Sequence, residues 1–371
     1  MESIKSTFLE HHREKGFKTH KSFPLVIDDP TVLFTNATIT PFKRMFTGEV
    51  PFDDFALVQR CLRLGGTGGT QEAARTNPNY TSLFDMLGSG VFEVDHDEAV
   101  KYFVDMLDAL GIAKRKLIFS SIGGDALSLA LTSTSLDPGQ LRVFKDSSAV
   151  KHEWSFGEGD LHGRGVIAWF SEGGYDQDPE LSDCVQIGRI VHIDGISEGS
   201  TVKPFEYAAF DMGLGMGKVE LALTGNNDES MRLLRHLSNQ LKGIFNGISD
   251  GDAHYMANLC CVINELTAEG LTPGNKKHAY VLRKLIRSLI EATWLQSGQI
   301  VDAQDVLGPC LEGFIDKSRA AKAISSEEIA LRDILNKAHS MSAKHPEMTQ
   351  DKLHATFGIK PSLLKLQVDK S

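Results

Sequence analysis

The sequence predicts an α+β fold, in which an antiparallel sheet flanked by helices is followed by an all-helical region. The first sign is a pair of strand-like stretches, residues 59–64 and 79–88, on either side of a glycine-rich loop. Strands joined by such a loop pair in antiparallel fashion. The second sign is a stripe of apolar residues at helical spacing over residues 95–110. The third is the C-terminal part, where only helical stripes recur, at residues 231–241 and 281–290.

The N-terminal elements follow from local patterns. Residues 2–15 place apolar side chains near one helical face, and Gly16 is expected to end that helix. Two short strands, residues 22–27 and 32–35, are predicted on either side of a turn that contains proline. Residues 42–46 then indicate a short amphipathic helix.

The middle of the chain continues the alternation of strand and helix. Residues 117–121 form an expected strand, and Gly123 and Gly124 before Asp125 favour a strand-to-helix turn over a phosphate cradle. Residues 186–192 alternate in the manner of a strand.

A domain boundary is expected at residues 224–228, where Gly, Asn and Asp interrupt the pattern. It divides the chain into a domain of residues 1–222 and a helical domain of residues 223–371. Residues 327–340 are predicted to form a further helix near the end.

Composition narrows the class of protein. The 371 residues are 41% apolar, which is enough for an ordinary buried core. Acidic residues outnumber basic ones by 49 to 39, so a broad basic surface for nucleic acid is disfavoured, although a local basic patch stays open. No apolar run approaches the roughly 18 residues of a membrane span. The N-terminus lacks the layout of a signal peptide. We therefore expect a cytoplasmic protein without a membrane partner.

Cysteine and histidine give no sign of a metal site. The five cysteines lack metal-ligand spacing and an even disulfide framework, so buried free thiols are expected. His11, His12 and His20 have no carboxylate or thiol partner at ligand spacing, which favours packed or solvated side chains. No metal-binding residue is predicted.

Arg63 is the first candidate for chemistry. It stands at the end of the first strand of the glycine-loop pair, aimed at whatever the loop covers. A guanidinium can hold a phosphate through two parallel hydrogen bonds, which the ammonium of lysine cannot do. The loop could then close over a nucleotide. Taken alone, the stretch is more typical of a tight turn or a floppy hairpin than of a phosphate site.

Four stretches together resemble the catalytic domain of alanyl-tRNA synthetase. They occur in the order and near the spacing of that family, within a similarity that runs from about residue 3 to about residue 315; they are residues 29–37, 59–63, 84–88 and 213–218. The resemblance implies a class II synthetase-like antiparallel sheet for the first domain. For the second it implies the helical domain with which the family recognises the tRNA acceptor stem.

The resemblance also implies an ATP site with Mg²⁺. Arg63 would hold the α-phosphate and stabilise the charge that builds at phosphorus. Phe84 and Met86 would belong to an adenine platform, although a plain buried strand is the alternative. Where the family has a lysine four residues after the arginine, this chain has Thr67.

The glycine-rich stretch near residue 215 departs from the family at its end. Gly213 and Gly215 would let the backbone approach ATP closely. The family's closing glutamate and arginine are replaced by Gly217 and Lys218. Lys218 keeps the positive charge, and with Arg63 it is the second expected catalytic residue, but it loses the planar stacking surface of arginine.

The implied amino-acid pocket contains Trp154, Gln186, Asp211 and Gly213. Trp154 matches a family tryptophan that restricts the pocket to a small side chain, with a core aromatic as the alternative. Asp211 matches the aspartate that binds the substrate's ammonium group, with a helix N-cap as the alternative. Gln186 is a substitute for a family asparagine. After Trp154, residues 158–165 lack the paired glycine-proline-cysteine element of the family.

In the helical domain the helical pattern resembles the family, but the residues at the positions that contact the tRNA acceptor stem in the family differ. An asparagine that contacts the acceptor stem aligns with Lys277, an arginine with Ser288, and an aspartate-histidine-x-arginine element with residues 258–261. The basic stretch of residues 276–287 could hold a phosphate backbone or form a solvated helix.

The leading hypothesis is therefore an adenylate-forming aminoacyl ligase, a stand-alone paralogue without the editing and C-terminal domains. It would activate a small, alanine-like amino acid and pass the aminoacyl group to a small-molecule acceptor in a specialised biosynthetic pathway. A first alternative keeps tRNA as the acceptor with altered recognition. A second is a catalytically inactive protein that binds an amino acid or nucleotide. A homodimer is one expected assembly.

Overall fold

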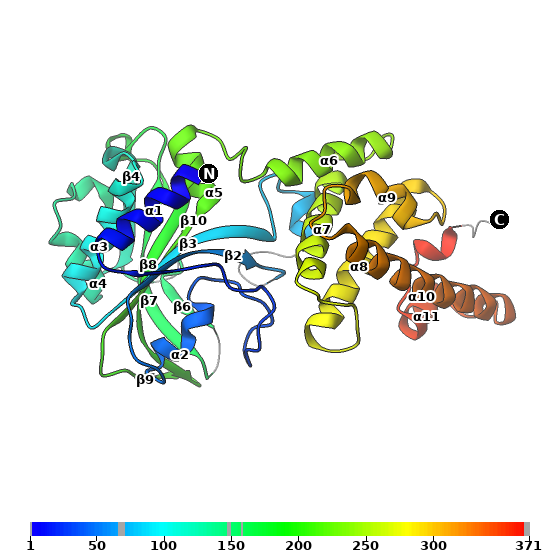
Figure 1. Ribbon diagram of the computed structural model, residues 1–371, viewed down its shortest axis with the longest axis horizontal. Coiled ribbons are helices and arrows are strands. Elements are labelled where there is room, and N and C mark those ends of the chain that lie inside the picture. The colour runs from blue at the N-terminus through cyan, green and yellow to red at the C-terminus, as the bar shows by residue number, and fades with distance from the viewer. Residues whose placement is uncertain (1, 66–70, 147–149, 157–158, 367–371) are drawn as a thin grey trace. The chain divides into compact units, whose positions relative to one another are not determined.

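The computed structural model describes residues 2–65, 71–146, 150–156 and 159–366, and the chain forms two compact units (Figure 1). The sheet unit comprises Met1–Leu62 and Phe84–Met231. The helical unit comprises Arg63–Leu83 and Arg232–Ser371. The expected boundary at residue 222 places residues 63–83 in the N-terminal part, whereas in the structure this segment packs with the helices.

The sheet unit is built on one large, mostly antiparallel sheet. Among the described residues it has ten strands in the order β1-β2-β3-β10-β8-β7-β4-β5, with β6 paired to β7 and β9 to β8. β1 pairs with β2, and β4 with β5, in parallel. The fold class predicted from sequence is confirmed. The strands are β1 (Lys18–His20), β2 (Phe55–Leu62), β3 (Leu83–Phe92), β4 (Leu117–Ile122), β5 (Leu141–Phe144), β6 (Glu153–Ser155), β7 (Leu161–Phe170), β8 (Val185–Glu198), β9 (Thr201–Pro204) and β10 (Ala209–Gly215).

Helices bury one face of this sheet. Side chains from α1 (Glu2–Glu14), α3 (His96–Ala109), α4 (Ala126–Thr132) and α5 (Met216–Thr224) form an apolar core with alternate residues of β10 and its neighbours. The side chain of Asp125 accepts from the Leu127 N–H at the start of α4, so the predicted strand-to-helix turn is confirmed.

An aromatic cluster covers one end of the opposite face. It joins residues of η1 (Thr40–Phe42) and α2 (Lys43–Phe46) to strands β2, β3, β8 and β10. Phe42 stacks on Phe55, with ring centroids 3.7 Å apart. The rest of that face carries the polar and glycine residues described below.

Residues 22–35 differ from the prediction. The two expected strands are wrong, because the described backbone there forms only an isolated bridge between Val26 and Phe34. The carboxylate of Asp29 accepts from the backbone N–H groups of Thr31 and Val32 and so turns the chain. This local hydrogen bonding competes with strand pairing.

The helical unit is built around α7. All but a few of the α7 side chains are buried by the surrounding helices. The predicted helix at residues 327–340 lies inside the longer α10. None of the described helices has the length and apolar character to cross a membrane. The helices of this unit are α6 (Arg232–Ile244), α7 (Asp250–Ala268), α8 (Lys277–Ser297), α9 (Ala303–Leu311), α10 (Lys317–Lys344) and α11 (Gln350–Phe357).

Candidate functional site

Alternation along β10 selects the face on which a substrate could bind. Phe210, Met212 and Leu214 enter the helix-covered core. Because successive side chains of a strand point to opposite faces, Asp211 and Gly213 lie on the other face. That face is where the aromatic cluster ends and the sheet becomes polar.

Asp211 is a buried carboxylate in the middle of a strand. Its relative exposure is 8%, and its Oδ1 atom has no hydrogen-bond partner among the described residues. Burial raises the pKa of Asp211 to about 7, and the nearby positive charge of Arg189 acts in the opposite direction. The helix-cap alternative does not apply, since Gly215 is the N-cap of α5.

Arg189 on β8 is a site residue that sequence reasoning missed. It pairs with Gly213 across the two strands, which makes it a diagonal neighbour of Asp211. Diagonal neighbours are within reach of long side chains. The available signal was its position as the one charged residue in the apolar stretch 185–191.

Gln186, the residue expected to replace the family asparagine, is exposed. It pairs with Trp169 of β7, beyond an irregularity in the strand register. The structure therefore places Arg189, and not Gln186, next to Asp211. A shift of register within one strand moves a side chain from one face to the other, which sequence alone does not resolve.

Glycines shape the floor beside Asp211. Gly213 faces Gly88 of β3 in the strand register. A Cβ atom added at Gly213 would meet its nearest neighbours, Met86 Sδ and Thr38 Oγ1, at 3.5 and 4.0 Å, so space remains above this residue. At Gly88 the corresponding space is filled, because Thr38 Oγ1 would lie 2.1 Å from an added Cβ. Of these two facing glycines, only Gly213 has open space above it.

The proposed adenine platform is continuous with this floor. Met86 pairs with Gly215 in the register of β3 and β10, and Phe84 lies two residues earlier on the same face of β3. Both side chains are half-buried. Lys218, in the first turn of α5, is exposed, and its Cγ would lie 3.3 Å from a Cβ at Gly215.

A second polar group lies on the same face beyond Arg189. Trp169 Nε1 donates to Ser120 Oγ at 2.9 Å, and His152 Nε2 lies 3.0 Å from the same oxygen. Burial lowers the pKa of His152, and the charge of Arg189 adds to that effect. The positive charge of Arg189 thus acts on both Asp211 and His152, lowering the pKa of each.

Trp154 lies at the edge of the aromatic cluster. It pairs with Gly163 of β7 and meets Phe156 edge to face, with ring centroids 4.7 Å apart. Its side chain is half-buried against the cluster. This packing fits the core-aromatic alternative, and it sets Trp154 on the same face of the sheet as Asp211.

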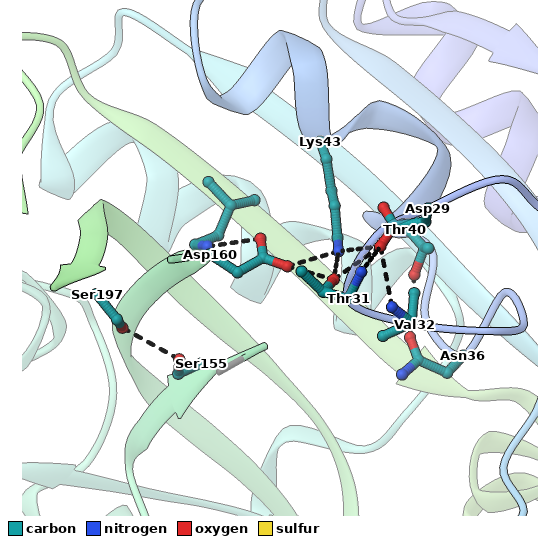
Figure 2. A network of polar contacts seen from close by, with 10 residues as sticks. Asp29, Thr31, Val32, Asn36, Thr40, Lys43, Ser155, Asp160 and Ser197 are labelled. Carbon is teal, nitrogen blue, oxygen red and sulfur yellow. Dashed lines mark hydrogen bonds and ion pairs between the residues drawn. The ribbon is translucent and has the colours of Figure 1, made fainter. Parts of the chain in front are cut away.

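A buried ion network ties the hairpin that carries Trp154 to residues 29–46 (Figure 2). Lys43 Nζ lies 2.7 Å from Asp160 Oδ2 and 3.1 Å from Asp29 Oδ1. Thr31 Oγ1 donates within the same group, and the ammonium also lies 4.0 Å from the centroid of the Phe156 ring. Although burial alone would raise it, hydrogen bonds from Thr31, Val32 and Lys43 lower the pKa of Asp29.

Arg63 belongs to the helical unit, in the segment that joins β2 to β3. Its side chain is half-buried, and its backbone N–H donates to the Ser82 carbonyl oxygen at 2.8 Å. Thr67 lies outside the described residues. In the same unit, Tyr280 on α8 is 42% exposed, with the Arg283 guanidinium and the Lys284 ammonium 5.3 and 5.7 Å from its ring centroid.

No group of three or more His, Cys, Asp or Glu side chains in the described part of the chain is arranged to hold a metal ion. The five cysteines are free thiols, four of them buried.

Comparison with known proteins places this arrangement in a family. The family model described as tRNA synthetases class II (A) matches residues 3–296. The alanine–tRNA ligase of Petrotoga mobilis is 26% identical over 85% of this chain and 37% of its own length. That of Halorhodospira halophila is 26% identical over 90% of this chain and 41% of its own length. The chain spans about two fifths of the length of these relatives.

Among solved structures, the pyrrolysyl-tRNA synthetase of Desulfitobacterium hafniense has a TM-score of 0.37 and 11% identity. The match covers 62% of this chain and 72% of that chain.

Proposed function

Because the chain belongs to the alanyl-tRNA synthetase family of class II tRNA synthetases, we propose that it activates a small, alanine-like amino acid with ATP. The product is an aminoacyl-adenylate, from which the aminoacyl group passes to an acceptor. The acceptor is a small-molecule amine or hydroxyl in a specialised biosynthetic pathway.

The observation that supports amino-acid binding is the unpartnered carboxylate oxygen of Asp211. A buried acceptor without a partner costs free energy, which an ammonium group would recover through a charge-assisted hydrogen bond. Arg189 beside it keeps the carboxylate closer to its charged form. The open space at Gly213 gives the backbone of the amino acid room next to this carboxylate.

Activation is a displacement at phosphorus. A carboxylate oxygen of the amino acid forms a bond to the α-phosphorus of ATP, the bond to the pyrophosphate oxygen breaks, and pyrophosphate leaves. Arg63 would stabilise the charge on the α-phosphate in the transition state. In the second step the acceptor atom bonds to the carbonyl carbon, AMP leaves, and the acceptor proton passes to solvent.

The sheet unit offers an apolar surface that could take the adenine ring of a nucleotide. Met86, Gly213 and Gly215 present half-buried apolar surface and accessible backbone on one face of adjacent strands. Lys218 would lie near the phosphates. Mg²⁺ would enter bound to the phosphates of ATP, as this ion commonly does in proteins.

Exchange of labelled pyrophosphate into ATP, dependent on each common amino acid in turn and run without tRNA, tests the proposal. Exchange with alanine, glycine or serine is expected. Absence of exchange with every amino acid, in folded protein that binds ATP, would refute it.

A tRNA acceptor is the alternative that one observation favours. On α8 an exposed tyrosine ring has the Arg283 and Lys284 cations 5.3 and 5.7 Å from its centroid, which suits a nucleotide base and backbone. If tRNA is the acceptor, charging should weaken steeply as salt rises, because each phosphate contact releases a counterion.

The third candidate is a binding protein without turnover. Threonine at residue 67 removes a positive charge that the family places near the phosphates, and lysine at residue 218 loses the bidentate grip of arginine. Calorimetric binding of ATP and an amino acid without exchange or hydrolysis would favour it.

A further inference from the structure

Helix α7 of the helical unit packs closely against the segment that carries Arg63. Both lie in the helical unit, and Figure 1 shows them side by side. A Cβ atom added at Gly251 would lie 2.1 Å from the Arg75 carbonyl oxygen, so the two backbones touch there. Arg75 also forms an ion pair with Asp252, and its guanidinium lies 3.9 Å from the centroid of the Tyr255 ring.

A hydrogen-bond network around Ser82 joins α7 to the segment that carries Arg63. Asn258 Oδ1 accepts from the Ser82 N–H at 2.9 Å, and Asn258 Nδ2 donates to Gln71 Oε1 at 2.7 Å and to Ser82 Oγ at 3.1 Å. Gln71 Nε2 donates to the same hydroxyl at 2.6 Å. Asn258 and Ser82 are both fully buried. Buried amides with every partner in place fix geometry, because moving any member leaves another unsatisfied.

One hydrogen bond connects this network to Arg63. The Ser82 carbonyl oxygen accepts from the Arg63 N–H at 2.8 Å, while the N–H of the same serine is held by Asn258. His254 Nε2 donates to the Tyr80 carbonyl oxygen at 2.8 Å, one turn earlier on α7. The backbone next to Arg63 is therefore anchored to α7 through Ser82.

We propose that Asn258 is a positioning residue for Arg63, and that the helical unit thereby takes part in amino-acid activation and not only in acceptor binding. The effect of Asn258 on catalysis rests on the proposed function, whereas its structural role does not. A misplacement of about 1 Å in a group that stabilises a transition state costs about a hundredfold in rate. Asn258 would act through Ser82, without touching a substrate.

The test compares Asn258→Leu with Asn264→Leu. Asn264 lies on the same helix, is buried to a similar degree, and accepts from the backbone N–H of Ile315 at 2.8 Å. Unlike Asn258, its side chain forms no hydrogen bond to residues 71–83 among those the structure describes. In pyrophosphate exchange, N258L is expected to lower kcat at least tenfold and to leave the KM for the amino acid within twofold of wild type. N264L should leave both within twofold.

Asn258→Asp gives a partial rescue. It keeps an oxygen that accepts from the Ser82 N–H but loses the donor to Gln71 Oε1, so its kcat should lie above that of N258L and below that of wild type. Wild-type kcat in N258L, or an equal loss in N264L, would overturn the proposal.

A second measurement does not depend on activity. Hydrogen exchange of the peptide that contains the Ser82 amide should be at least tenfold faster in N258L than in wild type, and unchanged in N264L. If wild type shows no pyrophosphate exchange, the proposed function fails, and this comparison alone decides whether Asn258 holds the segment. Unchanged protection in N258L would overturn the positioning role.

Discussion

At the scale of single residues, Asp211 combines burial, an unpaired oxygen and a raised pKa within the described part of the sheet. A carboxylate whose pKa is raised to about 7 in the folded protein binds a proton that the unfolded chain releases near 3.8. Its contribution to the free energy of unfolding is therefore unfavourable at neutral pH and disappears below about pH 4. Such a cost is consistent with a group kept for binding.

Asp211→Asn should remove this pH dependence. Because the wild-type penalty grows as the pH rises from the unfolded toward the folded pKa, the stability advantage of D211N over wild type should increase by about 3 kcal/mol between pH 5 and pH 8. Urea unfolding at the two pH values measures this difference. An equal difference at both would show that Asp211 is not the titrating group.

The same substitution should affect substrate binding. An ammonium group needs the charged carboxylate, so the KM for the amino acid in wild type should fall as the pH rises from 6 to 8. In D211N the trend should vanish and KM should rise about tenfold or more, the cost of a charge-assisted hydrogen bond. A KM that keeps its pH trend in D211N would place the ammonium site elsewhere.

Arg189 should influence the pH at which the KM for the amino acid falls. Its charge lowers the pKa of Asp211, so Arg189→Met is expected to move the midpoint of the KM profile upward by about one pH unit. Arg142→Met is the matched control, since Arg142 also lies on a strand of the sheet but pairs with Asp178 at 2.7 Å. Coincident midpoints for R189M and wild type would contradict the assignment.

At the scale of elements, the ion network around Lys43 joins three segments that share no secondary structure. Its carboxylates come from residue 29 in a loop and from residue 160 just before β7, and all three side chains are at most 14% exposed. Such a network fixes the hairpin of β6 and β7 against α2, and with it the place of Trp154.

Lys43→Met should destabilise the protein by about 3 kcal/mol, because it leaves two buried carboxylates without their cation. Lys18→Met is the control: Lys18 pairs with Asp53 at 3.0 Å with both side chains well exposed, and such pairs contribute at most about 1 kcal/mol. Chemical denaturation of both variants measures the difference. Equal effects would mean that burial adds nothing to the Lys43 network.

At the scale of the whole molecule, the acceptor separates the candidate functions. With a small-molecule acceptor, aminoacyl transfer from the adenylate should proceed without tRNA and change little between 50 and 200 mM salt. Transfer to tRNA should instead fall by about tenfold or more over that range if several phosphates are contacted. Single-turnover transfer to a pool of amines and to total tRNA, at both salt concentrations, distinguishes them.

Patterns of nearby residues along the chain predicted several of the helices. The helices α1, α3, α6 and α8 follow from apolar spacing, and the capping aspartate before α4 marks its start, since these signals depend on residues within a few positions of each other. The glycine-rich stretch and Asp211 were proposed as site residues through the resemblance to the synthetase family, which is read from short stretches of the chain. The loop at residues 22–35 was missed because side-chain hydrogen bonds from Asp29 replaced strand pairing.

The sequence by itself therefore determined the class of fold, several of the helices and the strands β2, β3, β4 and β8. Through its family resemblance it also proposed Asp211 and the neighbouring glycines as site residues. Only the tertiary structure decided which side chains meet. Arg189 reaches Asp211 through the register of two strands, Lys43 meets Asp160 across 117 residues, and Asn258 holds Ser82 across 176. Periodicity is encoded by neighbours along the chain, whereas register and long-range contact depend on the packing of the whole core, which no short stretch contains.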